Sequence, residues 1–199
     1  MAAILALTLA PAAGSAKTDL YVYGKIEGCP HCVEVIKSLL KAGGELNAMF
    51  ADIDRSIAAG DAFATAYERL FPDLQKYHIP LTVVARDGEA VAAIFGVFSP
   101  KDAIYLADKA TETGKLVVVY PDRRIYYWDR GEKSTWLKLL ADTAAKYGEP
   151  IEELRGEVER AEAGGSGTMI FAVEIIVAAA LLAAFAAYLR RRRAGRKRK

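Results

Sequence analysis

Two cysteines separated by two residues, Cys29-Pro30-His31-Cys32, restrict the fold of this 199-residue chain more than any other feature. Residues 20–26 are rich in β-branched and aromatic side chains and precede Gly28, which predicts a strand followed by a tight turn. After the motif, apolar residues recur at helical spacing up to Gly43. Pro30 suits the first helical position, where no N–H is needed. The motif is therefore expected at a strand-to-helix junction.

The residues that follow predict a regular succession of elements. A second strand is expected at 46–53, and a helix at 63–77 that Pro72 bends or splits. Residues 79–85 and 90–96 flank an Asp-Gly turn and predict a hairpin. A further helix should begin after Ser99 and run to Thr113. The order is strand, helix, strand, helix, strand, strand, helix.

Beyond Gly114 the chain predicts additional elements that pack on this core. Segments 116–120 and 124–128 flank a Pro-Asp-Arg turn and read as a second hairpin, followed by a helix at 134–147. The aromatic residues of this added segment are expected to form a packing layer, and a surface for a partner is the alternative. They are Tyr126, Tyr127, Trp128 and Trp136. Residues 149–168 then read as a charged helical stalk that ends in a Gly-rich linker.

Both ends of the chain predict an extracytoplasmic protein held by a membrane anchor. Residues 169–189 form a run of 21 residues with one charge, Glu174, long enough to cross a bilayer of roughly 30 Å. The basic tail at 190–199 should remain in the cytoplasm, which leaves the rest outside the plasma membrane. A buried core helix is the alternative, and Glu174 either snorkels to the interface or contacts a partner. Residues 1–16 predict a signal peptide, with an uncleaved anchor as the alternative.

The charge distribution argues against nucleic acid as a partner. The tail at 190–199 holds eight of the 27 Lys and Arg residues and no acid, so 19 bases face 25 acids in the remaining chain, a net charge of −6. A protein that grips phosphates carries its basic patch on the folded domain. No nucleic-acid ligand is expected.

The two cysteines predict a redox pair. They are the only cysteines and should lie in an oxidising compartment, so they are expected to bond to each other. Cys29 at a helix N-terminus has its thiolate stabilised and the pKa of its thiol lowered, which makes it the nucleophile. Cys32, one turn further, is the resolving residue. His31 adds a cation or N–H donor near the Cys29 sulfur and favours oxidation, unless it merely faces solvent.

This order of elements, with Cys-Pro-His-Cys before a helix and Ile79-Pro80 before a hairpin, resembles the thioredoxin superfamily, and the motif resembles that of DsbA-type oxidases. The resemblance implies an α/β thioredoxin-like fold, a central mixed sheet flanked by helices, over residues 17–114, with 115–148 added to it. It also implies that Pro80 is cis and lies beside the disulfide, where it and Ile79 would bind substrate. The chain departs from the family in having no acid at 21–23, with Glu27 expected near the surface, and no obvious large helical insertion.

The favoured function is therefore a membrane-anchored thiol-disulfide oxidoreductase that oxidises or isomerises proteins and needs no cofactor. Its partners would be proteins with thiols or disulfides, together with a redox partner that is a small thiol or another protein, such as a membrane-embedded one. A thiol reductase is one alternative, since direction depends on the reduction potential. A copper- or zinc-binding module is another, with few ligands besides the cysteines and the two histidines, and a scaffold with an inert disulfide is the third.

Overall fold

The computed structural model describes residues 17–43 and 46–163. The chain divides into one compact unit, Met1–Arg155, and a second, Gly156–Lys199, whose described residues, 156–163, are helical. Within the described ranges, no helix is both long and apolar enough to cross a membrane. The expected signal peptide at 1–16, the membrane span at 169–189 and the basic tail lie outside these ranges.

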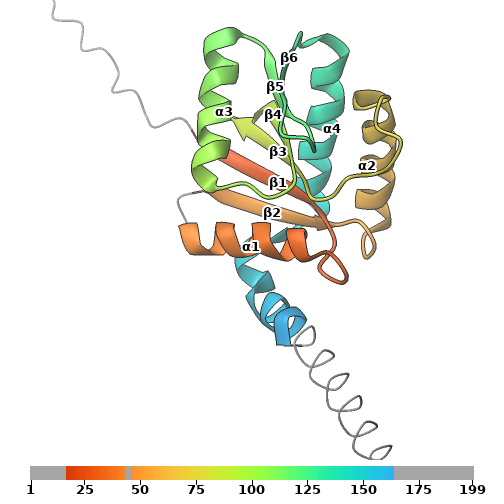
Figure 1. Ribbon diagram of the computed structural model, residues 1–199, viewed down its shortest axis with the longest axis vertical. Coiled ribbons are helices and arrows are strands. Elements are labelled where there is room, and N and C mark those ends of the chain that lie inside the picture. The colour runs from red at the N-terminus through yellow and green to blue at the C-terminus, as the bar shows by residue number, and fades with distance from the viewer. Residues whose placement is uncertain (1–16, 44–45, 164–199) are drawn as a thin grey trace, which may run out of the picture. The chain divides into compact units, whose positions relative to one another are not determined.

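The first unit is built on a seven-stranded mixed sheet in the order β6-β5-β4-β3-β1-β2-β7 (Figure 1). Two neighbouring pairs, β1 with β2 and β4 with β5, are parallel, and the other four are antiparallel. The strands are β1 (Thr18–Gly24), β2 (Asn47–Asp52), β3 (Leu81–Arg86), β4 (Glu89–Phe95), β5 (Leu116–Val119), β6 (Ile125–Trp128) and β7 (Glu149–Pro150). The expected mixed sheet flanked by helices is thus confirmed.

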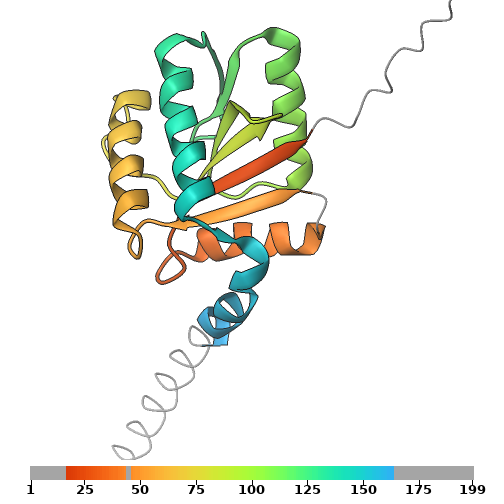
Figure 2. The ribbon, with the colours of Figure 1, turned by 180° about the vertical axis from the view of Figure 1, so that it is seen from behind.

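Helices cover both faces of the sheet (Figures 1 and 2). They are α1 (Pro30–Ala42), α2 (Ile57–Leu70), α3 (Pro100–Thr113) and α4 (Gly131–Tyr147), followed by a 3-10 turn, Ile151–Leu154. The helix α3 begins as its sequence predicts: Ser99 and Asp102 form a reciprocal capping box behind Pro100, and Gly114 ends it in a left-handed conformation. Such caps satisfy backbone groups that a helix end leaves unpaired.

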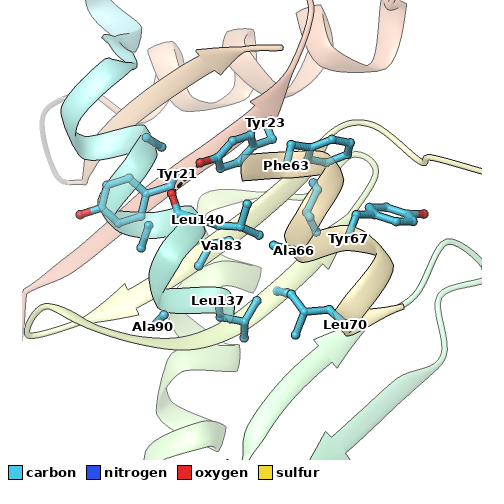
Figure 3. Packing of buried hydrophobic residues seen from close by; sticks show 14 of the residues in the cluster. Tyr21, Tyr23, Phe63, Ala66, Tyr67, Leu70, Val83, Ala90, Leu137 and Leu140 are labelled. Atoms are coloured by element: carbon cyan, nitrogen blue, oxygen red, sulfur yellow. Dashed lines mark hydrogen bonds between the residues drawn. The ribbon is translucent and has the colours of Figure 1, made fainter. Parts of the chain in front are cut away.

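Alternation along the strands separates two apolar layers. On β1, Tyr21 and Tyr23 point to the face covered by α2 and α4, together with Val83 of β3 (Figure 3). Successive strand residues face opposite sides, so Leu20 and Val22 belong to the other face, which α1 and α3 cover. A sheet buried on both faces explains why its central strands read as continuous apolar runs.

The helix α2 differs from its predicted position. The predicted span was 63–77, whereas the helix begins at Ile57 and ends at Leu70. Ser56 provides the start because its side chain accepts the N–H of Ala59. Pro72 does not bend the helix but follows its end, since a residue before proline disfavours the helical conformation. Residues 71–80 therefore form a loop that leads from α2 to β3.

The elements after Gly114 extend the same sheet. The strand β5 pairs with β4, and α4 packs against α2 and the sheet. Tyr126, Trp128 and Trp136 pack against the core, as the favoured reading predicted, whereas Tyr127 is 47% exposed. The predicted stalk is wrong in its first residues. Residues 149–150 pair with β2, and the next two apolar side chains, Ile151 and Leu154, are buried in the same unit.

Candidate active site

The cysteine pair lies at the N-terminus of α1. Cys29 is the N-cap residue, Pro30 opens the helix, and the two sulfur atoms form a disulfide with 5.3 Å between the Cα atoms. The Cys29 Sγ accepts the backbone N–H of Cys32 at 3.3 Å, and the Cys29 carbonyl accepts the N–H groups of Cys32 and Val33. Helix N-terminal N–H groups stabilise negative charge, so a thiolate at Cys29 would be favoured over one at Cys32.

The two cysteines differ in burial. Cys29 is 8% exposed, while Cys32, in the first turn of α1, is fully buried. Gly24, the last residue of β1, lies directly against the inner cysteine: a Cβ added there would be 2.8 Å from Cys32 Sγ and 3.5 Å from the ring of Phe50. The end of β1 therefore supports the Cys32 sulfur, and Cys29 is the member of the pair with some access to solvent.

His31 projects from the first turn of α1 into solvent. Its side chain is 72% exposed, and Nδ1 lies 3.8 Å from the carboxylate of Glu34, one turn along the helix. The influence of His31 on the Cys29 sulfur stays a prediction.

The peptide bond between Ile79 and Pro80 is cis. Pro80 immediately precedes β3, and its carbonyl oxygen accepts the N–H of Gly96 at 2.9 Å. In the antiparallel pairing of β1 with β3, Tyr23 stands opposite Leu81, so Pro80 occupies the position opposite Gly24. Because Gly24 lies against Cys32, the sheet brings the cis proline and the disulfide to the same end of these strands.

A buried tyrosine that the sequence does not single out holds the loop before this proline. Tyr67 of α2 is 1% exposed. Its hydroxyl donates to the carbonyl of Lys76 at 2.8 Å and accepts the N–H of His78 at 3.1 Å. Burial raises the pKa of Tyr67 to about 12, so the hydroxyl keeps its proton at neutral pH. Further back along the loop, the Tyr120 hydroxyl donates to Asp73 at 3.1 Å.

Charged pairs surround the turn between β1 and the disulfide. Lys25 lies 3.5 Å from Asp54, and Arg55 lies 3.7 Å from Glu27, whose side chain is 90% exposed as the sequence predicted. The buried acid on β1 is Asp19, which accepts a hydrogen bond from Asn47 at the opposite end of the strand from the cysteines. It is therefore too far along the strand to act on the disulfide.

A cavity of about 110 Å³ opens beside this turn, between Ile26, Phe50, Arg55 and Tyr147. Neither cysteine, nor Ile79 or Pro80, lines it. Among the described residues, no group of three or more His, Cys, Asp or Glu side chains is arranged to hold a metal ion. What the site offers is thus a disulfide of which one cysteine, Cys29, is slightly exposed, at the same end of the strands as a cis proline.

The chain was compared with protein-family models and with curated proteins. Neither comparison found a match. The structural observations are therefore the basis for classification: the Cys29–Cys32 pair at the start of a helix and a mixed sheet flanked by helices fit a thioredoxin-like fold.

Proposed function

We propose that this protein is a thiol-disulfide oxidoreductase of the thioredoxin superfamily. Cys29 is the nucleophile when the pair is reduced and the sulfur that a substrate thiolate attacks when the pair is oxidised, and Cys32 is the resolving residue. The observation that carries the proposal is the asymmetry of the pair. The Cys29 sulfur is at the helix N-terminus and accepts a backbone N–H, while Cys32 is fully buried. An inert structural disulfide needs no such asymmetry, whereas exchange needs one accessible sulfur with a stabilised thiolate.

In the oxidising direction, a substrate thiolate attacks Cys29 Sγ, the bond to Cys32 breaks, and Cys32 leaves as a thiolate. A second substrate thiolate then attacks the substrate sulfur of the mixed disulfide. The substrate disulfide forms, and Cys29 leaves as a thiolate stabilised by the N-terminus of α1. Two electrons pass from substrate to enzyme: the substrate thiols lose their protons to solvent before they attack, and the enzyme thiolates that form exchange protons with solvent. The reverse sequence reduces a substrate disulfide, and both sequences together isomerise one.

The Cys-Pro-His-Cys motif supports an oxidase resembling the DsbA type, because a cation or donor beside Cys29 stabilises the reduced form. The proposed substrate-binding residues are Ile79 and Pro80, whose backbone lies at the same end of the sheet as the disulfide. Redox equivalents would come from a small thiol or a second protein, such as a membrane-embedded one, since the chain has no third cysteine.

Trapping experiments test the roles of the two cysteines. In the Cys32→Ser variant of the full-length protein, the Cys29 thiol is first activated with an aromatic disulfide. On addition of reduced, unfolded ribonuclease, this variant should accumulate a mixed disulfide between Cys29 and the ribonuclease. The matched Cys29→Ser variant, treated identically, should trap at least tenfold less because Cys32 is buried. Equal trapping by both variants, or none by either together with no exchange by the wild type, would reject the proposal.

Anchoring in the membrane by a C-terminal helix is a separate proposal, supported by the apolar run at 169–189 and the eight basic residues that follow it. The redox unit would then face the outside of the plasma membrane. In intact bacterial cells that express the Cys32→Ser variant, a membrane-impermeant maleimide should modify Cys29 after mild reduction. Labelling only after cell lysis would place the redox unit in the cytoplasm.

A further inference from the structure

The loop at 72–78 presents the backbone that leads into the cis proline. Few of its side chains contribute to the core: Leu74 packs against it, and the ring centroid of Tyr77 lies 5.7 Å from that of Phe63 and 5.0 Å from that of Tyr67. The side chains of Lys76, Tyr77 and His78 are all exposed, and that of Tyr77 is 53% exposed. A loop whose side chains are mostly exposed depends largely on hydrogen bonds to its backbone to offset the entropy that its ordering costs. The path toward Ile79 and Pro80 therefore needs a restraint on the backbone itself.

The Tyr67 hydroxyl supplies that restraint. It bridges two backbone groups of the loop, the carbonyl of Lys76 and the N–H of His78, so one oxygen atom holds three consecutive residues. On the other side of the cis bond, the N–H of Gly96 holds the carbonyl of Pro80. The segment that contains Ile79 is thereby fixed at both ends, by a side chain of α2 and by the backbone at the end of β4.

The ring that carries this hydroxyl is itself immobilised. Its centroid lies 5.3 Å from that of Phe63, 5.2 Å from that of Phe71 and 5.8 Å from that of Phe95. Figure 3 shows Tyr67 beside Phe63 at the side of the core opposite Tyr21. Aromatic contacts of this kind favour defined ring orientations, so the hydroxyl has a fixed position relative to the sheet.

We propose that Tyr67 is a positioning residue for disulfide exchange with polypeptides: its hydroxyl fixes the backbone at 76–78 and so places the Ile79-Pro80 segment for docking of the substrate chain beside Cys29. The inference rests on the proposed function. It assigns to α2, which carries no cysteine and lies on the opposite face of the sheet from α1, a specific part in substrate binding.

The variant Tyr67→Phe removes both hydrogen bonds and retains the ring. In the full-length protein, we expect kcat/KM for oxidation of reduced, unfolded ribonuclease to fall about tenfold, mainly through a higher KM. The rate of reaction with dithiothreitol and the equilibrium constant of that reaction should stay within about twofold of wild type, since a small dithiol needs no docked backbone. This division between large and small substrates would not follow from a loss of stability alone.

The matched control is Tyr23→Phe. Tyr23 belongs to the same core, is fully buried and donates its hydroxyl to the backbone carbonyl of Leu140 on α4 at 2.6 Å, so its hydrogen bond does not restrain the loop at 72–78 (Figure 3). It should lose a comparable amount of stability while its kcat/KM for ribonuclease stays within about twofold of wild type. A similar loss of kcat/KM in both variants would overturn the inference.

Two further results would overturn it. One is a Tyr67→Phe variant whose kcat/KM for ribonuclease equals that of wild type, or falls in the same proportion as its rate with dithiothreitol. The other is measured on the wild type and needs no variant to fold: the His78 amide should exchange its hydrogen at least tenfold more slowly than an unstructured amide, and unprotected exchange contradicts the bond to Tyr67. If the wild type shows no thiol-disulfide exchange with ribonuclease at all, the proposed function itself fails and the inference with it.

Discussion

Adding one methyl group at Gly24 should destabilise the oxidised protein through a collision with a single atom. The new Cβ would lie 2.8 Å from Cys32 Sγ, about 1 Å inside ordinary contact distance. The disulfide prevents this sulfur from rotating away, and overpacking of this kind costs about 1–3 kcal/mol. Against it stands a gain of about 0.5–1 kcal/mol, because alanine has less conformational freedom than glycine in the unfolded chain.

The background Cys32→Ala isolates the collision. Without the sulfur, the next atoms would be the Cβ of residue 32 at 3.4 Å and a ring carbon of Phe50 at 3.5 Å, both close to normal contact. Gly24→Ala should then be neutral or slightly stabilising. The difference between the effects of Gly24→Ala in the two backgrounds, about 1–3 kcal/mol, is the coupling between the methyl group and the sulfur. The effect of the disulfide on stability cancels because each comparison is made within one background.

The free energy of unfolding can be followed in urea by the fluorescence of the two tryptophans, Trp128 and Trp136, which both belong to the first unit. The full-length protein in detergent is used throughout, and m should stay unchanged among the variants. An equal effect of Gly24→Ala in the wild type and in Cys32→Ala would refute the close approach of β1 to the inner cysteine.

Three further predictions concern stability, measured by the same urea unfolding. The pKa of Tyr67 is raised from 10.0 to about 12, so this tyrosine ionises at lower pH in the unfolded protein than in the folded one, and the free energy of unfolding should fall as pH rises from 10 to 12. The loss due to Tyr67 is about 1 kcal/mol between pH 9 and 11 and should be absent in Tyr67→Phe. The same pH profile in Tyr67→Phe and in the wild type would contradict this prediction. Thr82 is buried within β3 and its Oγ1 has no hydrogen-bond partner in the described structure, so Thr82→Val should raise the free energy of unfolding by about 1 kcal/mol, whereas a loss would indicate a partner for the hydroxyl. Phe71 is fully buried and contacts four aromatic rings, so Phe71→Ala should cost about 3–5 kcal/mol, and a cost below about 1 kcal/mol would show that the loop after α2 is not packed as described.

Local sequence patterns were sufficient to predict those helices, strands and turns whose limits depend only on their own residues. The strand before Cys29, the helix after Pro30 and the hairpin around Asp87 each combine a periodic apolar pattern with a turn or cap residue, and the structure has all three. The cis bond before Pro80 was expected from the resemblance to the thioredoxin superfamily and is present. These features place the cysteines at a helix start without knowledge of any distant contact.

Features that depend on contacts between distant segments were not predictable in this way. Nothing local distinguishes Tyr67 from the other aromatic residues of the core; its role follows from a loop that returns to it nine to eleven residues later. The sequence does not predict the start of α2 because residues 57–62, Ile-Ala-Ala-Gly-Asp-Ala, show no clear helical repeat of large apolar side chains. Residues 149–150 read as stalk because a two-residue strand has no pattern of its own, and only its pairing with β2 defines it.

The two outer strands bear on how a protein proposed to act on unfolded chains avoids aggregating with them. An exposed sheet edge is a template onto which an extended polypeptide can add by backbone hydrogen bonds. Here, at one edge β7 has only two residues and one of them, Pro150, has no N–H to donate. At the other, β6 has four residues and is followed by Asp129 and Arg130, charged residues that interrupt further pairing. An incoming chain is thereby discouraged from the sides of the sheet and left with the strand ends, where the disulfide lies.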